Sequence, residues 1–330
     1  MKKMKFWSMI MLTAMMLPFG GSCASNDSDE EKPLVVEVKD DGTTSNGSQC
    51  VIIDDKNLYL DYVKYTISEG DMVVSGYDKD GLKGLVNIVA KISYRGKVYE
   101  VVSIQDSAFR GCETLTSIII PNSVTNIGHG AFDNCRNLES ISIPNGVTKI
   151  ENDVFAYCSS LTLITIPNSV ETIGEEAFYY CSSLTSITIP NSVKNIKSYA
   201  FRRCSSLTSI TIPNSVTTIG RGVFHGCSSL TSIIFSNNIS SIESGTFMDC
   251  SSLTSITIPS NVTSMRGMVF RGCSNLTTIY CKAKTPPSIT LDNTFDSRTY
   301  ENATMYVPQG SIDEYKSTYG WKLFHNIIEE

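Results

Sequence analysis

Apolar and polar positions follow a pattern that repeats every 23 residues between about Phe109 and Cys281. Each repeat carries a cysteine, with a phenylalanine three residues before it and a leucine three residues after it. The eight cysteines of the series are Cys112, Cys135, Cys158, Cys181, Cys204, Cys227, Cys250 and Cys273. Self-similarity at a fixed period of about 20–50 residues indicates a solenoid, in which each unit packs on its neighbours.

The pattern within one repeat predicts one coil of backbone. Apolar residues of 184–189 follow the spacing L-x-x-I-x-I, which predicts a short strand with these side chains facing inward. Pro190 ends the strand because it cannot donate to a ladder, and apolar residues of 193–196 return to the core. The segment 174–181 predicts a short helical turn. Residues 104–281 are therefore expected to form a solenoid, with a parallel sheet on one face and short helical turns on the other.

The segment 50–103 is rich in strand patterns but lies outside the period. Its candidate strands are 51–53, 58–60, 65–67, 72–74 and 97–102, separated by Gly and Asp turns. A solenoid needs its open ends covered. We therefore interpret 50–103 as a β-rich N-terminal cap, with a separate binding module as the alternative.

The first residues have the features of a targeting signal. Lys2, Lys3 and Lys5 precede an apolar run at 6–19, which is short for a membrane span. The residues up to Cys23 resemble the lipobox of bacterial lipoproteins, although Gly20 stands where that family prefers leucine. The resemblance implies a signal peptide over 1–22 and a lipidated Cys23. Cleavage by an ordinary signal peptidase near Ala24 is the competing interpretation.

The segment that follows, 23–49, predicts a lipid-anchored disordered tether because its hydrophobicity is low and its charge is high. The acidic run at 26–31 looks like the export signal that sends some Gram-negative lipoproteins to the outer face of the cell. A solvated spacer would have the same composition. The expected localisation is the outer membrane or cell surface, facing outside.

The repeat motif itself, L-x-x-I-x-I-P-x-x-V-x-x-I-x-x-x-A-F-x-x-C, resembles the BspA-type leucine-rich repeat of bacterial surface proteins. The match extends over roughly half of the chain, copy after copy. The segments 303–315 and Gly320-Trp321 also look like the usual ending of that family, so 282–330 is interpreted as a C-terminal cap. The resemblance implies a cell-surface binding or adhesion protein, with no known catalysis by the repeat.

Charge and residue clusters exclude several functions. The formal net charge of -6 is a poor match for nucleic acid. His129 and His225 lie in different columns of the repeat, so neither assembles a catalytic group, and the absence of C-x-x-C argues against a metal site. The cysteine column is close enough for disulfides, but we expect buried, reduced thiols, which pack well there as small apolar groups. We expect no enzyme activity, metal or cofactor, and a monomer.

The positions that vary between repeats predict the binding site. The two residues before each cysteine differ most, and stacking places Tyr157, Tyr180 and Arg203 in one row beside Tyr179 and Arg202. Exposed Tyr and Arg are enriched in binding hot spots, whereas cation–π packing without a ligand is the alternative. The predicted ligand-binding residues are Tyr157, Tyr179, Tyr180, Tyr199, Arg202, Arg203 and Arg221.

A second surface offers a different ligand. Positions such as Ser186 and Thr188 form rows of hydroxyl groups on the outer face of the predicted sheet. We therefore predict non-catalytic recognition of a host protein, a matrix protein or another cell. The alternative is a glycan-binding module that uses the Ser/Thr face.

Overall fold

The computed structural model describes residues 35–290 and 292–330. The chain divides into two units, Met1–Pro33 and Leu34–Glu330, and the fold below is that of the second. The predicted signal peptide, Cys23 and the first part of the predicted tether lie outside the described residues. Within these ranges, no helix combines the length and the apolar character needed to cross a membrane.

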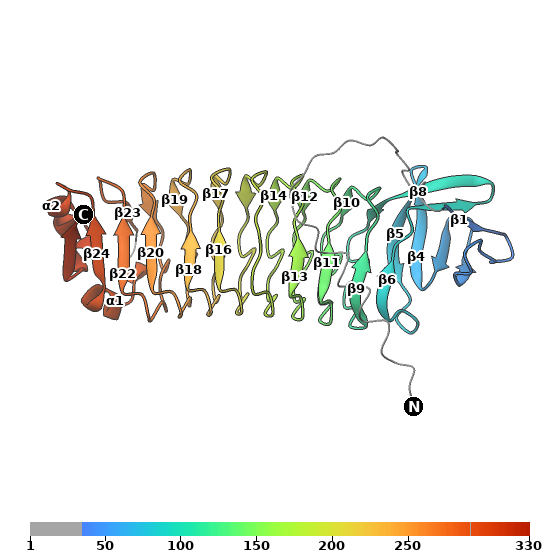
Figure 1. Cartoon of the computed structure of the whole chain (residues 1–330), viewed down its shortest axis with the longest axis horizontal. Helices are drawn as coiled ribbons and strands as arrows, with labels where there is room; N and C mark the ends of the chain where they lie inside the picture. Colours follow the sequence, from blue (N-terminus) through green and yellow to red (C-terminus); the bar gives the residue numbers. More distant parts are fainter. Residues whose placement is uncertain (1–34, 291) are drawn as a thin grey trace, which may run out of the picture. The chain divides into compact units, whose positions relative to one another are not determined.

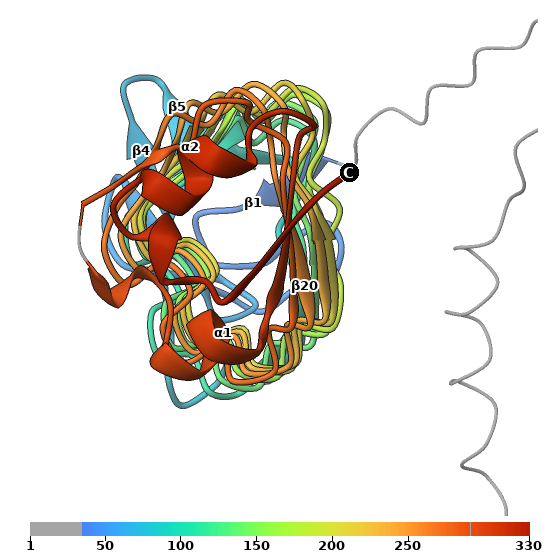
Figure 2. The same cartoon turned by 90° about the vertical axis from the view of Figure 1, so that its left-hand side faces the viewer.

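Successive 23-residue coils stack side by side, as Figure 1 shows, and the coils overlie one another as loops in the end-on view of Figure 2. Their inward apolar side chains are buried. One side of the coils carries a parallel sheet, here called the main sheet. The register advances by one repeat from strand to strand, so that Ser117, Ser140 and Leu163 lie in one row. The main-sheet strands are β6 (Gly84–Asn87), β9 (Leu115–Ile119), β11 (Ser140–Ser142), β13 (Leu163–Thr165), β16 (Ser209–Thr211), β18 (Ser232–Ile234), β20 (Ser255–Ile258), β22 (Thr278–Cys281), β24 (Thr304–Val307) and β25 (Asn326–Glu329).

The opposite side of the coils carries a second parallel ladder that the sequence pattern did not predict. Each of its strands is two residues long, which is too short to show an alternation of apolar and polar residues. These strands are β10 (Asn126–Ile127), β12 (Lys149–Ile150), β14 (Thr172–Ile173), β15 (Asn195–Ile196), β17 (Thr218–Ile219), β19 (Ser241–Ile242), β21 (Ser264–Met265) and β23 (Ser288–Ile289). Strands such as β12, β14 and β15 pair with the equivalent residues one repeat away.

The segments predicted as short helical turns are tight turns that also bond to the next coil. The backbone N–H groups of Tyr179 and Cys181 donate within their own turn, while those of Phe178 and Tyr180 donate to carbonyls of the following coil. This alternation satisfies the buried backbone on both sides. The predicted fold class, a leucine-rich-repeat solenoid with a cap at each end, is confirmed.

A ladder of phenylalanine and cysteine side chains forms the centre of the core. The rings from Phe109 to Phe270 stack on one another with centroids 5.2–5.8 Å apart. Each cysteine from Cys135 to Cys273 donates its Sγ–H to the carbonyl of a phenylalanine of the preceding coil, at 3.0–3.3 Å. Both residue types are buried, and we call this arrangement the Phe/Cys ladder.

The N-terminal cap is a mixed sheet in the order β1-β7-β8-β5-β4-β3-β2, with β10 beside β8. All five predicted strand segments are strands. Its members are β1 (Val35–Val38), β2 (Cys50–Ile52), β3 (Asn57–Leu60), β4 (Val63–Ser68), β5 (Asp71–Tyr77), β7 (Lys91–Tyr94) and β8 (Lys97–Ile104).

The prediction of a disordered tether is wrong for residues 35–49. β1 pairs in parallel with β7, and Val36 and Val38 are buried in the core of the cap. The average composition of 23–49 is polar, but the short Val-Val-Glu-Val segment alternates like a strand and finds its partner far along the chain. The structured cap therefore includes residues before the predicted boundary at 50.

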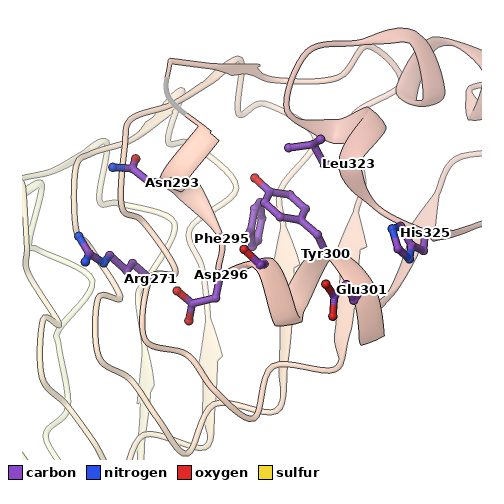
Figure 3. Close-up of a pocket in the computed structure, with 9 residues that line it drawn as sticks. Arg271, Asn293, Phe295, Asp296, Tyr300, Glu301, Leu323 and His325 are labelled. Carbon is purple, nitrogen blue, oxygen red and sulfur yellow. The ribbon is translucent and has the colours of Figure 1, made fainter.

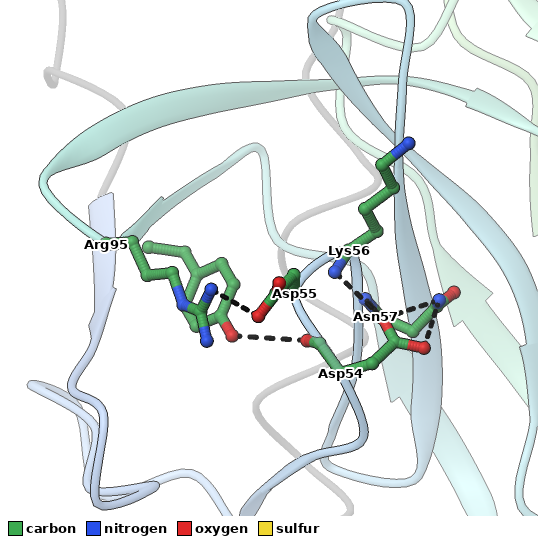
Figure 4. Close-up of polar contacts among 6 residues, drawn as sticks. Asp54, Asp55, Lys56, Asn57 and Arg95 are labelled. Carbon is green, nitrogen blue, oxygen red and sulfur yellow. Dashed lines mark hydrogen bonds and ion pairs between the residues drawn. The ribbon is translucent and has the colours of Figure 1, made fainter.

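Polar contacts secure the turn between β2 and β3 (Figure 4). The Asp54 carboxylate accepts hydrogen bonds from the backbone N–H groups of Lys56 and Asn57, at 2.8 and 2.9 Å. Arg95, in the β7–β8 hairpin, forms an ion pair with Asp55. The hydroxyl of Tyr94 donates to the Asp54 carbonyl at 3.3 Å. These contacts join two hairpins that lie far apart in the sequence.

The C-terminal cap continues the solenoid. β22, β24 and β25 extend the main sheet, and Phe295 stacks on Phe270 with centroids 5.1 Å apart. The fully buried Trp321 donates its Nε1–H to the Pro287 carbonyl at 2.7 Å. The parallel ladder therefore continues beyond the predicted solenoid boundary at 281. The cap contains η1 (Asp292–Thr294), α1 (Ser297–Asn302), α2 (Ile312–Ser317) and η2 (Trp321–Leu323).

Candidate binding surface

The turn edge of three consecutive coils carries a cluster of tyrosines. The ring of Tyr157 stacks on that of Tyr180, with centroids 5.6 Å apart, and meets the ring of Tyr179 edge-on at 5.0 Å. Tyr179 and Tyr180 are themselves perpendicular at 5.5 Å. Aromatic pairs at these distances and angles attract one another. Three of the four predicted tyrosines thus form one continuous surface.

Arginines of the next coils continue this cluster. The guanidinium of Arg202 lies between the rings of Tyr179 and Tyr199, 5.5 and 5.2 Å from their centroids. Arg203 lies 5.6 Å from the Tyr180 ring, and Arg221 5.6 Å from the Tyr199 ring. The structure therefore brings together all the predicted binding residues. We call them the Tyr/Arg patch: Tyr157, Tyr179, Tyr180, Tyr199, Arg202, Arg203 and Arg221.

The patch is open to solvent and carries unpaired positive charge. Tyr157 and Tyr180 are 41% and 37% exposed, and Arg203 and Arg221 are also exposed. In the part of the chain that the structure describes, none of the three patch arginines forms an ion pair with a carboxylate. The Nε of Arg202 is buried and has no hydrogen-bond partner among the same residues.

Each coil passes through a left-handed backbone conformation at two positions. One of these positions is that of Tyr180, directly before the cysteine. Three consecutive coils have Tyr157, Tyr180 and Arg203 there, with φ values of 58°, 61° and 60°, and the coils on either side of these three have Gly, Asn or Asp. A side chain with a Cβ costs roughly 1–2 kcal/mol in this conformation, and Asn and Asp tolerate it best. The column is Gly111, Asn134, Tyr157, Tyr180, Arg203, Gly226, Asp249 and Gly272.

The second left-handed position shows how glycine makes room for the patch. Tyr199 has φ of 60°, and Gly222 follows it one repeat later. A Cβ at Gly222 would lie 2.5 Å from Cε1 of Tyr199, so only glycine lets the ring lie over the next coil. Glycine recurs in this column at Gly130, Gly222 and Gly245, and this recurrence is a sequence signal for the left-handed backbone.

His225 and Asp249 border the patch and were not among the predicted binding residues. His225 Nε2 lies 3.3 Å from an Asp249 carboxylate oxygen, beside a cavity of about 320 Å³ that Tyr180 and Arg203 also line. Partial burial, together with the nearby positive charge of Arg202, lowers the pKa of His225. A neutral imidazole is thus favoured near the arginines. The 23-residue period already places His225 in one row with Tyr179 and Arg202, whereas the contact between His225 and Asp249 is seen only in the structure.

The opposite flank of the patch is acidic. Arg110 pairs with Asp133 at 2.9 Å, and His129 lies 3.6 Å from Asp153. Burial raises the pKa of both carboxyl groups. Glu176, whose pKa burial also raises, occupies the coil between this acidic group and Tyr199. The turn edge therefore changes from acidic to basic along the solenoid.

A cavity of about 650 Å³ lies at the C-terminal cap. Figure 3 shows Arg271 and His325 at opposite sides of it, with the Tyr300 ring between them. Asp296 is already engaged, because its carboxylate accepts the backbone N–H of Gly272 at 2.9 Å. Among residues 35–290 and 292–330, no group of three or more His, Cys, Asp or Glu side chains could hold a metal ion.

The Ser/Thr face of the main sheet has a groove of its own. The sheet is interrupted between β13 and β16 and again between β18 and β20. At the first interruption, a cavity of about 550 Å³ lies between β13 and the segment 186–191, which is not a strand. Ser186 and Thr188 are exposed as predicted. Leu163 and Ile234 are 52% and 66% exposed, so apolar side chains interrupt the hydroxyl rows.

Comparison with known proteins identifies the family. The model of the BspA type Leucine rich repeat region matches residues 98–208 and 171–300, which together span more than half of the chain. The chain therefore belongs to the BspA-type leucine-rich-repeat family. The comparison with curated proteins gave no match.

Solved structures of similar proteins agree with this assignment. A leucine-rich repeat protein from Bacteroides ovatus is 29% identical, with a TM-score of 0.64; the match covers 84% of this chain and 76% of that one. The T. pallidum Leucine Rich Repeat protein is 30% identical, with a TM-score of 0.51 and coverage of 65% and 88%. The chain is thus a repeat scaffold of the BspA type.

Proposed function

We propose that this protein is a non-catalytic binding protein of the cell surface, and that the Tyr/Arg patch holds a protein partner. One observation carries the proposal. Three consecutive coils place Tyr157, Tyr180 and Arg203 at a left-handed position where the flanking coils have Gly, Asn or Asp. Strained backbone positions of this kind cluster at functional sites, and packing alone would be served better by glycine.

The composition and rigidity of the patch support protein recognition. Tyrosine and arginine are enriched among the few residues that carry most of the binding energy of protein interfaces. Here their side chains are stacked in fixed positions on adjacent coils, so little conformational entropy is left to lose when a partner binds. The partner would be an extracellular protein of a host, of the matrix or of another cell.

Surface localisation rests on the sequence before residue 35. The basic start, the apolar run and Cys23 favour a lipid anchor in the outer membrane, with the solenoid facing outside. Metabolic labelling with a radioactive fatty acid, comparing the wild type with Cys23→Ala, tests the anchor. Digestion of intact cells with an added protease tests the orientation. An unlabelled wild-type protein, or one resistant on intact cells, would contradict this part of the proposal.

Binding is tested by incubating the purified full chain with arrays of extracellular-matrix proteins and of glycans. We expect saturable binding to a protein, lost in a variant that combines Tyr180→Ala with Arg203→Gln. The matched control changes the other face, Ser186→Ala with Thr188→Ala, and should bind as the wild type does. Circular dichroism of each variant checks that the fold is retained. Protein binding that survives the patch variant would refute the patch as the site.

A glycan-binding module remains the second candidate, because the groove between β13 and the segment 186–191 joins hydroxyl groups with the apolar Leu163. Exposed hydroxyl and aliphatic groups together suit the polar rims and apolar faces of sugars. In this case the array would show binding to oligosaccharides alone. The Ser186→Ala, Thr188→Ala variant would lose that binding while the patch variant kept it.

A further inference from the structure

The arginines of the Tyr/Arg patch differ from several others in the described chain by having no carboxylate partner. Arg95, Arg110 and Arg266 each pair with a carboxylate nearby. Arg203 and Arg221 instead rest on tyrosine rings and are exposed. A guanidinium stacked on a ring still has N–H donors that can bind a carboxylate in the bidentate manner. Among the described residues, the side chains of Arg203 and Arg221 thus have N–H donors that no carboxylate occupies.

Carboxylates border this positive region on both sides. Asp153, Glu175 and Glu176 lie on the preceding coils, and Asp249 lies on a following coil beside His225. A long polyanion such as a sulfated polysaccharide carries charge along its whole length, so it would meet these carboxylates and be repelled. A short anionic segment would contact the arginines alone.

We propose that the Tyr/Arg patch binds a short acidic segment of a protein partner, in which two or three Asp or Glu side chains flank an aromatic residue. The carboxylates pair with Arg203 and Arg221, and the aromatic ring packs on Tyr157 and Tyr180. This inference rests on the proposed function and specifies the chemistry of its ligand.

The test measures binding of fluorescent peptides to the purified full chain by anisotropy. One decapeptide carries three Glu residues around a Tyr, and its counterpart carries Gln in place of Glu. We expect the Glu peptide to bind at least about tenfold more tightly than the Gln peptide at low salt, with the difference shrinking as salt increases. The double variant Arg203→Gln, Arg221→Gln should lose that preference.

Two further variants keep the test independent of folding defects. Arg271→Gln removes an exposed arginine from the same edge outside the patch and should leave the affinity for the Glu peptide unchanged. Glu175→Lys extends the positive region at an exposed position, so it should strengthen binding of the Glu peptide, by about threefold or more at low salt. A gain of affinity cannot arise from misfolding.

The outcomes separate this inference from the proposed function. Suppose that a protein partner no longer binds the Tyr180→Ala, Arg203→Gln variant, but binds the Arg203→Gln, Arg221→Gln variant normally and with no dependence on salt. This result would overturn the acidic segment and leave the proposed binding function intact. Equal affinity for the Glu and Gln peptides would overturn it as well. Preferential binding of a heparin oligosaccharide over the Glu peptide would also do so. No partner on the array and no peptide binding would remove both proposals.

Discussion

The Phe/Cys ladder and the Tyr/Arg patch are made from neighbouring residues of the same turns, yet they follow opposite rules. Phe178 and Cys181 face inward and repeat identically in the coils on either side. Tyr179 and Tyr180, the two residues between them, face outward and have different counterparts in most other coils. The ladder is buried and unstrained, whereas the patch is exposed and includes left-handed backbone.

The difference separates stability from recognition within one repeat. Identical side chains one rung apart stack well, because every ring and thiol meets the same neighbour at the same distance. Repetition of this kind lets coil after coil share one core. A specific surface needs the opposite, since identical rungs would offer the same contacts everywhere. The predictions below test this division, beginning with the largest effect.

The thiols of the ladder should make the protein unstable at alkaline pH. Burial raises the pKa of Cys227 and of Cys273 to about 12, whereas an unfolded thiol titrates near 8.5. Stabilisation is therefore complete below about pH 8.5, and it is lost as pH rises towards the folded pKa, because only the unfolded state releases its protons. For seven such thiols we expect a loss on the order of 9 kcal/mol between about pH 8 and about pH 9.5.

Urea unfolding followed by circular dichroism at the two pH values measures this loss. In the Cys204→Ala variant one titrating group is absent, so the dependence on pH should be shallower by about one seventh. A free energy of unfolding that stays constant over this range would contradict the role assigned to the buried thiols.

Removal of one ring should damage the ladder far more than removal of one ring from the patch. Phe201 stacks on Phe178 and Phe224, with centroids 5.2 and 5.8 Å away, and is fully buried. We expect Phe201→Ala to lower the free energy of unfolding by about 3–5 kcal/mol. Tyr157→Ala is the matched control, and its cost should stay near 0.5–1.5 kcal/mol, about that of the lost ring contacts. Equal losses of unfolding free energy in Phe201→Ala and Tyr157→Ala would contradict the assignment of stability to the ladder and recognition to the patch.

The strain in the patch predicts an unusual order of stability at Tyr180. Both Tyr180→Gly and Tyr180→Ala remove the ring, but only glycine adopts φ of 61° without steric cost. We expect the glycine variant to be more stable than the alanine variant by about 1 kcal/mol, measured from urea midpoints. The same pair of substitutions at Lys194, which is exposed and has no positive φ, should favour alanine. Alanine more stable than glycine at 180 would show that the position is not strained.

The smallest effect on stability is expected for Arg203→Gln. The side chain is exposed, and its described contact is with the Tyr180 ring. Its removal should change the free energy of unfolding by about 0.5 kcal/mol, the usual range for an exposed cation–π contact. Thermal unfolding of the variant beside the wild type provides the measurement. A loss as large as that of Phe201→Ala would mean that the patch is structural.

The sequence predicted the coil, the inward residues and the members of the patch, because a fixed period specifies which residues stack. Leu184, Ile187 and Ile189 are buried as their spacing indicated. The same arithmetic placed Tyr180 next to Tyr157 one repeat away, although it gave no ring geometry and left open whether a ligand binds. The patch was thus predictable as a set of neighbours, and its ligand remains a proposal.

Other features were decided only in three dimensions. The parallel pairing of β1 with β7 depends on a partner far along the chain, so the short strand-like pattern of Val35–Val38 could not by itself show that this segment is part of the cap. The two-residue strands of the second ladder carry no periodicity of their own. The left-handed backbone of Tyr180 and Arg203 contradicts the preference of those residue types. There the hydrogen bonds of the stacked coils impose the conformation, and local preference yields to them.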